Sequence, residues 1–234
     1  MPTPPPSPSP SPSPLHGVAA AWYGAQPFDV VDALNRADAA ACRDGAAARV
    51  RIFTPAMPTL TLGRRVHNPE AAGLAETIAR CRAAGVSVVP VDRGGQATLH
   101  LPGQIVALVA IPCEKTALSF VVAALLDGAE EVARQHDLKP TRGHGADAGL
   151  WLGARKLTSI GLRHTHGVVH HGVAVNAAIE TALSRELTLC GRLGAGYADL
   201  MDAGALVKLP KVAELLIAAW GCRIVPSDLD MSSD

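Results

Sequence analysis

Two residues of this chain have the chemistry for covalent catalysis: a cysteine in the stretch TLCG, at position 190, and a lysine in GARKLTSIG, at position 156. An isolated thiol titrates near 8.5, and a neighbouring ammonium favours its nucleophilic thiolate form. A buried lysine can also lose its proton and act as a base. Cys190 beside Lys156 would therefore be an activated nucleophile for acyl transfer. Spacing alone does not bring the two together, and a cysteine more often packs as a small apolar side chain.

The histidines form a second group that could do chemistry. His164, His166, His170 and His171 are close in sequence, and alternate residues of a strand share one face. A metal site usually adds cysteines or carboxylates to its histidines, and none lies near these four. We therefore expect hydrogen-bonding histidines, no metal and no cofactor.

Composition limits the function classes. Lysine plus arginine and aspartate plus glutamate both number 21, so net charge favours neither nucleic acid nor an anionic membrane as partner. No apolar run has the length of a membrane-spanning helix. The chain lacks both the P-loop pattern and the G-x-G-x-x-G pattern. The five cysteines include no C-x-x-C, and the amino terminus lacks signal-peptide features, which together predict a cytoplasmic location.

The ends of the chain differ in composition from its middle. Residues 1–14 alternate proline with serine and favour polyproline II without a packing face. We predict a disordered tail over 1–17, one catalytic domain over 18–226 and a flexible tail over 227–234.

Hydrophobic spacing predicts the elements of that domain. Helices are expected at 27–45, 68–85, 116–137 and 211–220. Strands are expected at 48–55, 59–63, 86–92, 96–101, 104–111, 149–153, 156–165 and 167–176. Hairpins are expected at Pro102–Gly103, Gly153 and Gly167. Short hairpins favour antiparallel pairing, so the fold class is α+β, a mixed, largely antiparallel sheet with flanking helices.

Four blocks, taken together, resemble the lipoyl(octanoyl) transferase family. They read DRGGQATLHLPGQIV (92–106), GLWLGARKLTSIGLR (149–163), GVVHHGVAVN (167–176) and LTLCG (187–191). The resemblance covers about residues 27–205 and implies the fold of the biotin protein ligase and lipoate–protein ligase catalytic domains. It also implies transfer of an octanoyl group from octanoyl-acyl carrier protein to a lysine of a lipoyl domain, the first step of endogenous protein lipoylation.

The resemblance assigns roles residue by residue. Cys190 would carry the acyl thioester, Lys156 would lower its pKa or take its proton, and His171 and Asn176 would support them. The walls of the acyl site would be Arg93, Gly94, Gly95, Gln96, Ala97, Thr98, Leu99, His100, Ser159, Ile160, Gly161, Gly172, Val173 and Ala174.

The implied acceptors are lipoyl domains of 2-oxoacid dehydrogenase complexes and the glycine cleavage H protein. Two alternatives remain open: an ATP-dependent lipoate or biotin ligase, and a non-catalytic paralogue that binds carrier proteins. The chain departs from the family pattern at Leu99, Leu101, His170 and Leu189. Leu101 stands in place of a glycine, so we expect its side chain to border the acyl pocket.

Overall fold

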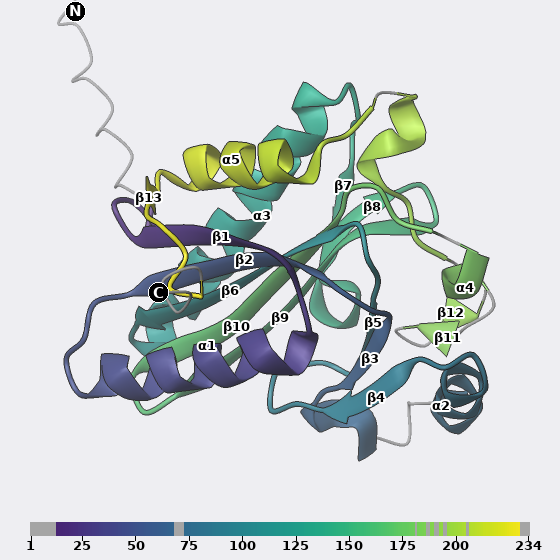
Figure 1. The fold of residues 1–234 in the computed structure, drawn as a ribbon, viewed down its shortest axis with the longest axis horizontal. Helices are drawn as coiled ribbons and strands as arrows, with labels where there is room; N and C mark the ends of the chain where they lie inside the picture. Colours follow the sequence, from purple (N-terminus) through teal and green to yellow (C-terminus); the bar gives the residue numbers. More distant parts are fainter. Residues whose placement is uncertain are drawn as a thin grey trace, which may run out of the picture.

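An eight-stranded mixed sheet forms the centre of the molecule. The computed structural model describes residues 13–67, 73–180, 182–185, 188–189, 192–193, 196–204 and 206–229. The strands of the large sheet are β1 (Ala19–Gln26), β2 (Arg49–Pro55), β6 (Gln104–Pro112), β7 (Thr141–Gly143), β8 (Gly149–Leu152), β9 (Arg155–Thr165), β10 (Val168–Asn176) and β13 (Arg223–Ile224). Their order is β13-β1-β2-β6-β10-β9-β8-β7 (Figure 1). β1 is parallel to β2 and to β13, and the other neighbours are antiparallel, which confirms the predicted fold class.

Two smaller sheets stand apart from the large one. One has the order β4-β3-β5, from β3 (Thr59–Leu62), β4 (Ser87–Pro90) and β5 (Ala97–His100). The other pairs β11 (Thr188–Leu189) with β12 (Arg192–Leu193).

The predicted hairpin at Pro102–Gly103 is wrong. β5 pairs with β3, whereas β6 pairs with β2 and β10, so these two residues carry the chain from one sheet to the other. Gly103 is held at the large sheet, because its N–H donates to Thr54 Oγ1 and its carbonyl accepts from Ala177 and Ala178. The predicted hairpins at Gly153 and Gly167 are confirmed, and both glycines have positive φ.

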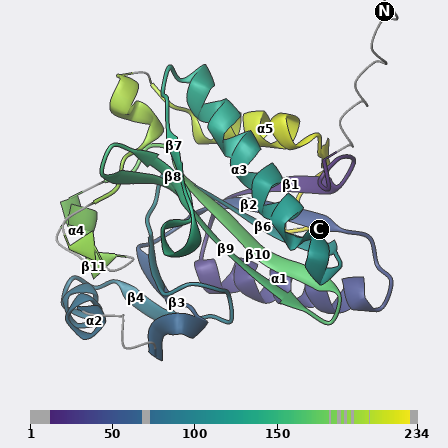
Figure 2. The ribbon, with the colours of Figure 1, turned by 180° about the vertical axis from the view of Figure 1, so that it is seen from behind.

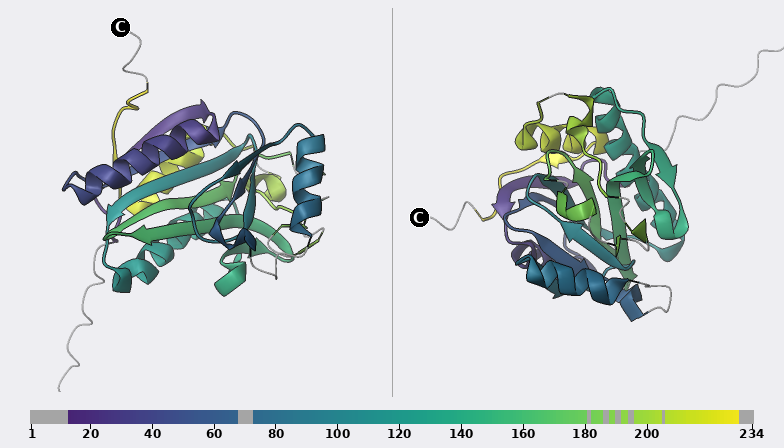
Figure 3. Two further views of the ribbon diagram at one scale, coloured as in Figure 1. Left: turned by 90° about the horizontal axis from the view of Figure 1, so that it is seen from below. Right: turned by 90° about the vertical axis from the view of Figure 1, so that its right-hand side faces the viewer.

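Helices cover both faces of the large sheet. The described helices are α1 (Phe28–Arg43), α2 (Leu74–Ala83), α3 (Leu118–Gln135), α4 (Ala182–Arg185) and α5 (Leu209–Trp220), with 3-10 turns η1 (Arg64–His67), η2 (Lys115–Ala117), η3 (Gly145–Asp147) and η4 (Leu200–Ala203). α1 lies on one face, and α3 and α5 lie on the other (Figures 1 and 2). The edge-on view shows these layers, with α2 and the β4-β3-β5 sheet at one end (Figure 3). The predicted helices at 27–45, 116–137 and 211–220 are confirmed; that at 68–85 is seen from Leu74, and residues 68–72 lie outside the described part.

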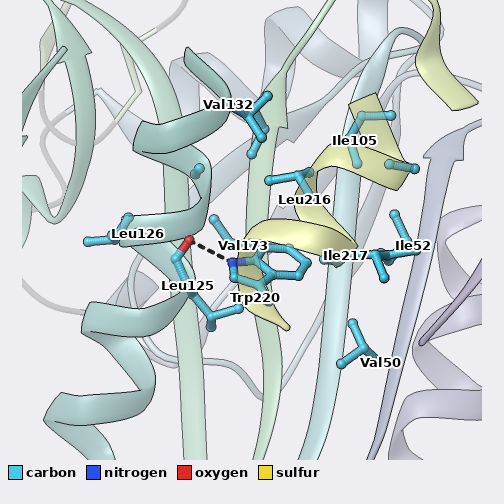
Figure 4. Packing of buried hydrophobic residues seen from close by; sticks show 14 of the residues in the cluster. Val50, Ile52, Ile105, Leu125, Leu126, Val132, Val173, Leu216, Ile217 and Trp220 are labelled. Carbon is cyan, nitrogen blue, oxygen red and sulfur yellow. Dashed lines mark hydrogen bonds between the residues drawn. The ribbon is translucent and has the colours of Figure 1, made fainter. Parts of the chain in front are cut away.

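The central strand β6 is apolar on both faces, as its unbroken run IVALVAI requires. Its odd-numbered residues pack under α3 and α5, and its even-numbered residues lie on the α1 side. Trp220 of α5 packs against α3, where its Nε1–H donates to the Leu125 carbonyl at 3.3 Å (Figure 4). Gly128 permits this packing, because a Cβ there would lie 2.2 Å from the Trp220 Nε1.

The structured domain extends beyond the predicted boundaries at both ends. Leu15 is fully buried in the main core, and Cys222 donates to its carbonyl. At the other end, Ser227 is buried and Asp228 is bound to the large sheet. The predicted tails over 1–17 and 227–234 are therefore too long; residues 1–12 and 230–234 lie outside the described part. Among the residues that are described, no helix has the length and hydropathy needed to cross a bilayer.

Candidate active site

Two adjoining cavities lie where the glycine segment before β5 meets β9 and β10. The smaller spans about 340 Å³ and the larger about 1270 Å³ of space not filled by protein atoms, and both volumes include open solvent. Residues that line both are Arg93, Thr98, Ser159, Ile160 and Gly161. The shared lining makes the pair one continuous site. We call the larger part, which borders Lys156, the outer cavity and the smaller part the inner cavity.

The inner cavity has an apolar wall that the sequence did not point to. Phe28, at the start of α1, lines it together with Val106 and Leu108 of β6. These residues read as ordinary core, because alternation along a strand does not reveal that one position borders a cavity. Ala174 and Val173 of β10 complete this wall. The inner cavity can therefore hold an apolar group.

The glycine segment is held tightly against β9. Gly94 N–H donates to the Leu162 carbonyl at 3.1 Å, and a Cβ at Gly94 would lie 2.8 Å from that oxygen. Arg93 is buried, and its Nη2 donates to the Thr61 carbonyl at 3.0 Å and to Thr61 Oγ1 at 2.8 Å. The segment is thus fixed to both β9 and β3, which gives the cavity a rigid wall.

A chain of buried hydrogen bonds runs from the small sheet to Lys156. His100 contacts Thr61 Oγ1 through Nε2 at 3.2 Å and Gln104 Oε1 through Nδ1 at 3.0 Å. Burial and the nearby Arg93 lower the pKa of His100 to about 3, so its ring is neutral at physiological pH. Gln104 Nε2 donates to Asn176 Oδ1 at 2.8 Å. Asn176 in turn donates to the carbonyl of Lys156 at 2.9 Å.

Lys156 is buried and points into the outer cavity. Its Nζ lies 5.0 Å from the centre of the Trp151 ring, a cation–π distance. Its backbone is fixed on the other side as well, because its N–H donates to the Gly196 carbonyl and its carbonyl accepts from Ala198. The lysine is thus held in a fixed position at the edge of the site.

Cys190 lies outside the described residues, so its position relative to Lys156 stays a prediction. The chain on either side of it is described in part. β11, which ends at Leu189, lies against β5, and Tyr197 forms a bridge to Lys156. Both flanking segments therefore lie near the walls of the cavities.

The structure brings together nearly all the predicted wall residues. Thirteen of the fourteen, all but Leu99, line one cavity or both. Leu99 is instead fully buried in the core beneath the small sheet, with its backbone bonded to the Tyr197 hydroxyl. Leu101, which was expected to border the acyl pocket, packs in the same core and lines neither cavity. Of the predicted supporting residues, His171 lines the inner cavity. Asn176 instead donates a hydrogen bond to the Lys156 carbonyl.

The sequence reasoning also missed two carboxylates beside His171. Its Nε2 lies 2.5 Å from Asp92 Oδ1, and its Nδ1 lies 3.4 Å from Asp32 Oδ1. Burial lowers the pKa of His171 to about 4, against the opposing effect of Asp92. Burial raises the pKa of Asp32, partly offset by Arg36. Asp92 directly precedes the RGG segment, and this position in the sequence could have indicated that it lies at the site.

Comparison with known proteins identifies the family. A profile of the lipoyl protein ligase A/B catalytic domain matches residues 33–191. An octanoyltransferase from Methylococcus capsulatus is 35% identical over 137 residues, which cover 58% of this chain and 66% of that protein. An octanoyltransferase from Burkholderia pseudomallei is 30% identical over 217 residues, which cover 86% of this chain and 88% of that protein. The chain spans slightly less than two thirds of the Methylococcus relative's length.

Solved structures show the same fold at low identity. A lipoate-protein ligase A bound with ATP superposes with a TM-score of 0.69 at 13% identity and covers 93% of this chain and 92% of its own. A biotin protein ligase from Leishmania major gives a TM-score of 0.50 at 10% identity, covering 87% of this chain and 73% of its own. With the profile matching well over half of its length, the chain belongs to the family of the lipoyl protein ligase A/B catalytic domain.

Proposed function

We propose that this protein is an octanoyltransferase of protein lipoylation, with Cys190 as nucleophile. One observation carries the proposal: a buried lysine, Lys156, faces a cavity that continues into an apolar pocket lined by Val106 and Leu108. Relatives at 30–36% identity bear the name octanoyltransferase, which agrees with this arrangement.

The reaction exchanges one thioester for another and then forms an amide. The Cys190 thiolate attacks the thioester carbonyl of octanoyl-acyl carrier protein, and the carrier's thiolate leaves. The amine of the acceptor lysine then attacks the Cys190 thioester, gives up a proton and releases the thiol. Covalent capture divides the transfer into two steps, so two bulky carriers need not bind together.

The other four cysteines are poor candidates for the nucleophile. Burial raises the pKa of Cys42 and of Cys81, and it raises the pKa of Cys222 to about 12. Burial, together with Glu114, raises the pKa of the Cys113 thiol. Each of these thiols stays protonated at neutral pH, and a protonated thiol is a weak nucleophile. None of the four lines either cavity.

The inner cavity is the place we assign to the acyl tail. Its wall combines the aliphatic side chains of Val106, Leu108 and Ala174 with the ring of Phe28. Each methylene that leaves water for such a wall contributes about 0.8 kcal/mol. The outer cavity is the larger and borders Lys156, so we assign the thioester end of the donor to it.

Lipoyl domains are the proposed acceptors, including those of 2-oxoacid dehydrogenase complexes and the glycine cleavage H protein. The family also includes ATP-dependent ligases, and such an enzyme would activate free lipoate as an acyl-adenylate. That route does not require a cysteine. The two activities can therefore be distinguished by whether transfer depends on Cys190.

Intact mass spectrometry of the full chain tests the proposal. Incubation with octanoyl-acyl carrier protein should add one octanoyl group, which hydroxylamine removes, and a lipoyl domain added afterwards should gain it. The Cys190→Ser variant should form no such adduct, whereas Cys113→Ser, which changes a partly exposed thiol, should form it normally.

Two outcomes would contradict this function. An adduct that maps to one of the other cysteines would remove Cys190 from its role. Modification of the lipoyl domain only when lipoate and ATP are supplied would favour the ligase activity instead.

A further inference from the structure

Two neighbouring histidines and one distant aspartate form a cluster between β10 and the segment after β4. His171 Nε2 lies 2.5 Å from Asp92 Oδ1, and His170 Nε2 lies 3.9 Å from Asp92 Oδ2. One ligand atom from each of the three residues lies within 4.8 Å of the other two. The two imidazole rings stack with their centres 4.6 Å apart.

This stacking depends on an unusual backbone at His171. Successive side chains of a strand point to opposite faces, which would send His171 towards α3. Its φ of +62° instead lies in the left-handed region, and its ring faces Asp32 of α1, on the same side as His170. Such a conformation costs about 1–3 kcal/mol and persists mainly at functional sites.

Three buried polar atoms of this cluster have no hydrogen-bond partner among the described residues. They are both ring nitrogens of His170 and Oδ1 of Asp32. His170 is only 3% exposed and Asp32 only 5%. A buried polar group without a partner costs about 1–3 kcal/mol, so two such side chains in one cluster call for an explanation.

We propose that Asp92, His170 and His171 bind one divalent transition-metal ion of the zinc class. The ion would replace the proton between His171 Nε2 and Asp92, and His170 Nε2 would gain a partner. The proton of His171 would move to Nδ1 and donate to Asp32 Oδ1, 3.4 Å away. A carboxylate behind a ligating histidine is the usual outer arrangement of such sites. Two imidazoles and one carboxylate suit zinc, cobalt or nickel and leave a fourth position for water.

The cluster is accessible from one side, through Asp92, and its carboxylates are surrounded by cations. The Asp92 side chain is 41% exposed, so an ion can enter there and the carboxylate can turn to close the remaining distances. Two cations beside the cluster are paired with its carboxylates: Arg163 Nε lies 3.4 Å from Asp92 Oδ2, and Arg36 Nε lies 3.3 Å from Asp32 Oδ2. Arg43 and Arg93 also act electrostatically on the two imidazoles. The sequence predicted no metal because no carboxylate lies near these histidines in the chain; the fold supplies Asp92.

Direct metal binding to the chelator-treated full chain tests this site, independently of any transferase activity. Titration with Co²⁺ should give visible d–d absorption that saturates at one ion per chain and is displaced by Zn²⁺. The bands should lack the intense near-ultraviolet absorption of cobalt–thiolate bonds, which excludes binding at a cysteine. His170→Phe keeps a stacking ring but removes a ligand and should abolish the bands, whereas His166→Ala, at an exposed histidine, should leave them unchanged.

Asp32→Asn provides a second variant if His170→Phe fails to fold. Loss of an outer carboxylate typically weakens metal binding about 10–100-fold, and this variant should do so without removing a ligand. Absence of saturable Co²⁺ binding in the unaltered chain would overturn the proposal. Binding that is equally tight in His170→Phe or Asp32→Asn would also overturn it.

Discussion

Lys156 is the residue on which the proposed chemistry most depends. Its ammonium is buried beside Trp151, and its backbone is fixed by Asn176 on one side and by Gly196 and Ala198 on the other. We expect Lys156→Met, which keeps the apolar stem but removes the charge, to slow alkylation of Cys190 by iodoacetamide at neutral pH. Each unit by which the thiol pKa rises corresponds to about 1.4 kcal/mol, or tenfold less thiolate.

The alkylation rate of Cys190 as a function of pH measures this effect. Lys211→Met is the matched control, because that lysine is exposed and pairs only with Glu214 among the described residues. Superimposable pH curves for Lys156→Met and the unaltered chain would leave Cys190 without this partner. Abolished octanoyl transfer with normal alkylation would assign Lys156 to the acceptor step instead.

At the residue scale, the sequence was informative wherever a motif carried the chemistry. The resemblance singled out the residues of the RGGQ and SIG stretches, and these line the cavities. It could not indicate Phe28 or Asp32, because both reach the site from α1. Asp92 lies within the DRGGQ block, but the resemblance assigned it no role. Leu99 shows the opposite error: it lies within a motif, but strand alternation turns its side chain into the core.

At the scale of elements, β6 and β10 form one wall of the proposed acyl pocket. Ala174 pairs with Val106 across these strands, and both line the inner cavity. We expect Ala174→Leu to fill part of that space and to shift the preference from octanoyl towards hexanoyl donors. The loss of burial for two methylenes, at about 0.8 kcal/mol each, would change the ratio of the two rates roughly tenfold.

Relative rates with hexanoyl, octanoyl and decanoyl donors measure this shift. The overpacked core should also lose about 1–3 kcal/mol of unfolding free energy. Leu101→Ala is the control, because it should cost about 2–5 kcal/mol in the core of the small sheet and leave the chain-length profile unchanged. A changed profile in Leu101→Ala, or an unchanged one in Ala174→Leu, would place the tail elsewhere.

Periodicity predicted the long elements well, and one of the three predicted strand pairings was wrong. The amphipathic helices and the strands β9 and β10 carry strong patterns, and all were found. β1 was missed because its sequence, AAAWYGAQ, lacks alternation, and β7 and β13 are too short to show a pattern. Sheet membership failed at β5 and β6, since a turn of Pro and Gly does not specify which strand lies alongside.

At the scale of the whole molecule, the carboxyl-terminal segment is bound to β1 and β2 through Asp228. Arg51 is buried and donates to Asp38 through two nitrogens and to Asp228 Oδ1 at 2.7 Å. Arg49 and the Tyr23 hydroxyl also donate to Asp228, each at 2.6 Å. Although burial opposes it, these hydrogen bonds and cations hold the pKa of Asp228 well below its ordinary value. Charge thus ties the carboxyl-terminal segment to β2, and the burial of Leu15 ties the segment before β1 to the main core.

The hydrogen bonds and ion pairs of Asp228 make a pH-dependent contribution to the free energy of unfolding. A carboxyl group whose pKa is lower in the folded state stabilises the fold above its unfolded pKa, near 4, and loses this effect as the pH falls further. We expect Asp228→Asn to reduce the unfolding free energy at pH 7 by about 1 kcal/mol, a small value because the side chain is 42% exposed. Urea unfolding between pH 7 and pH 3 should show the difference shrinking below about pH 4. Glu76→Gln, in an exposed helical pair, should change little at any pH. A difference that stays constant down to pH 3 would mean that Asp228 acts through packing rather than through its charge.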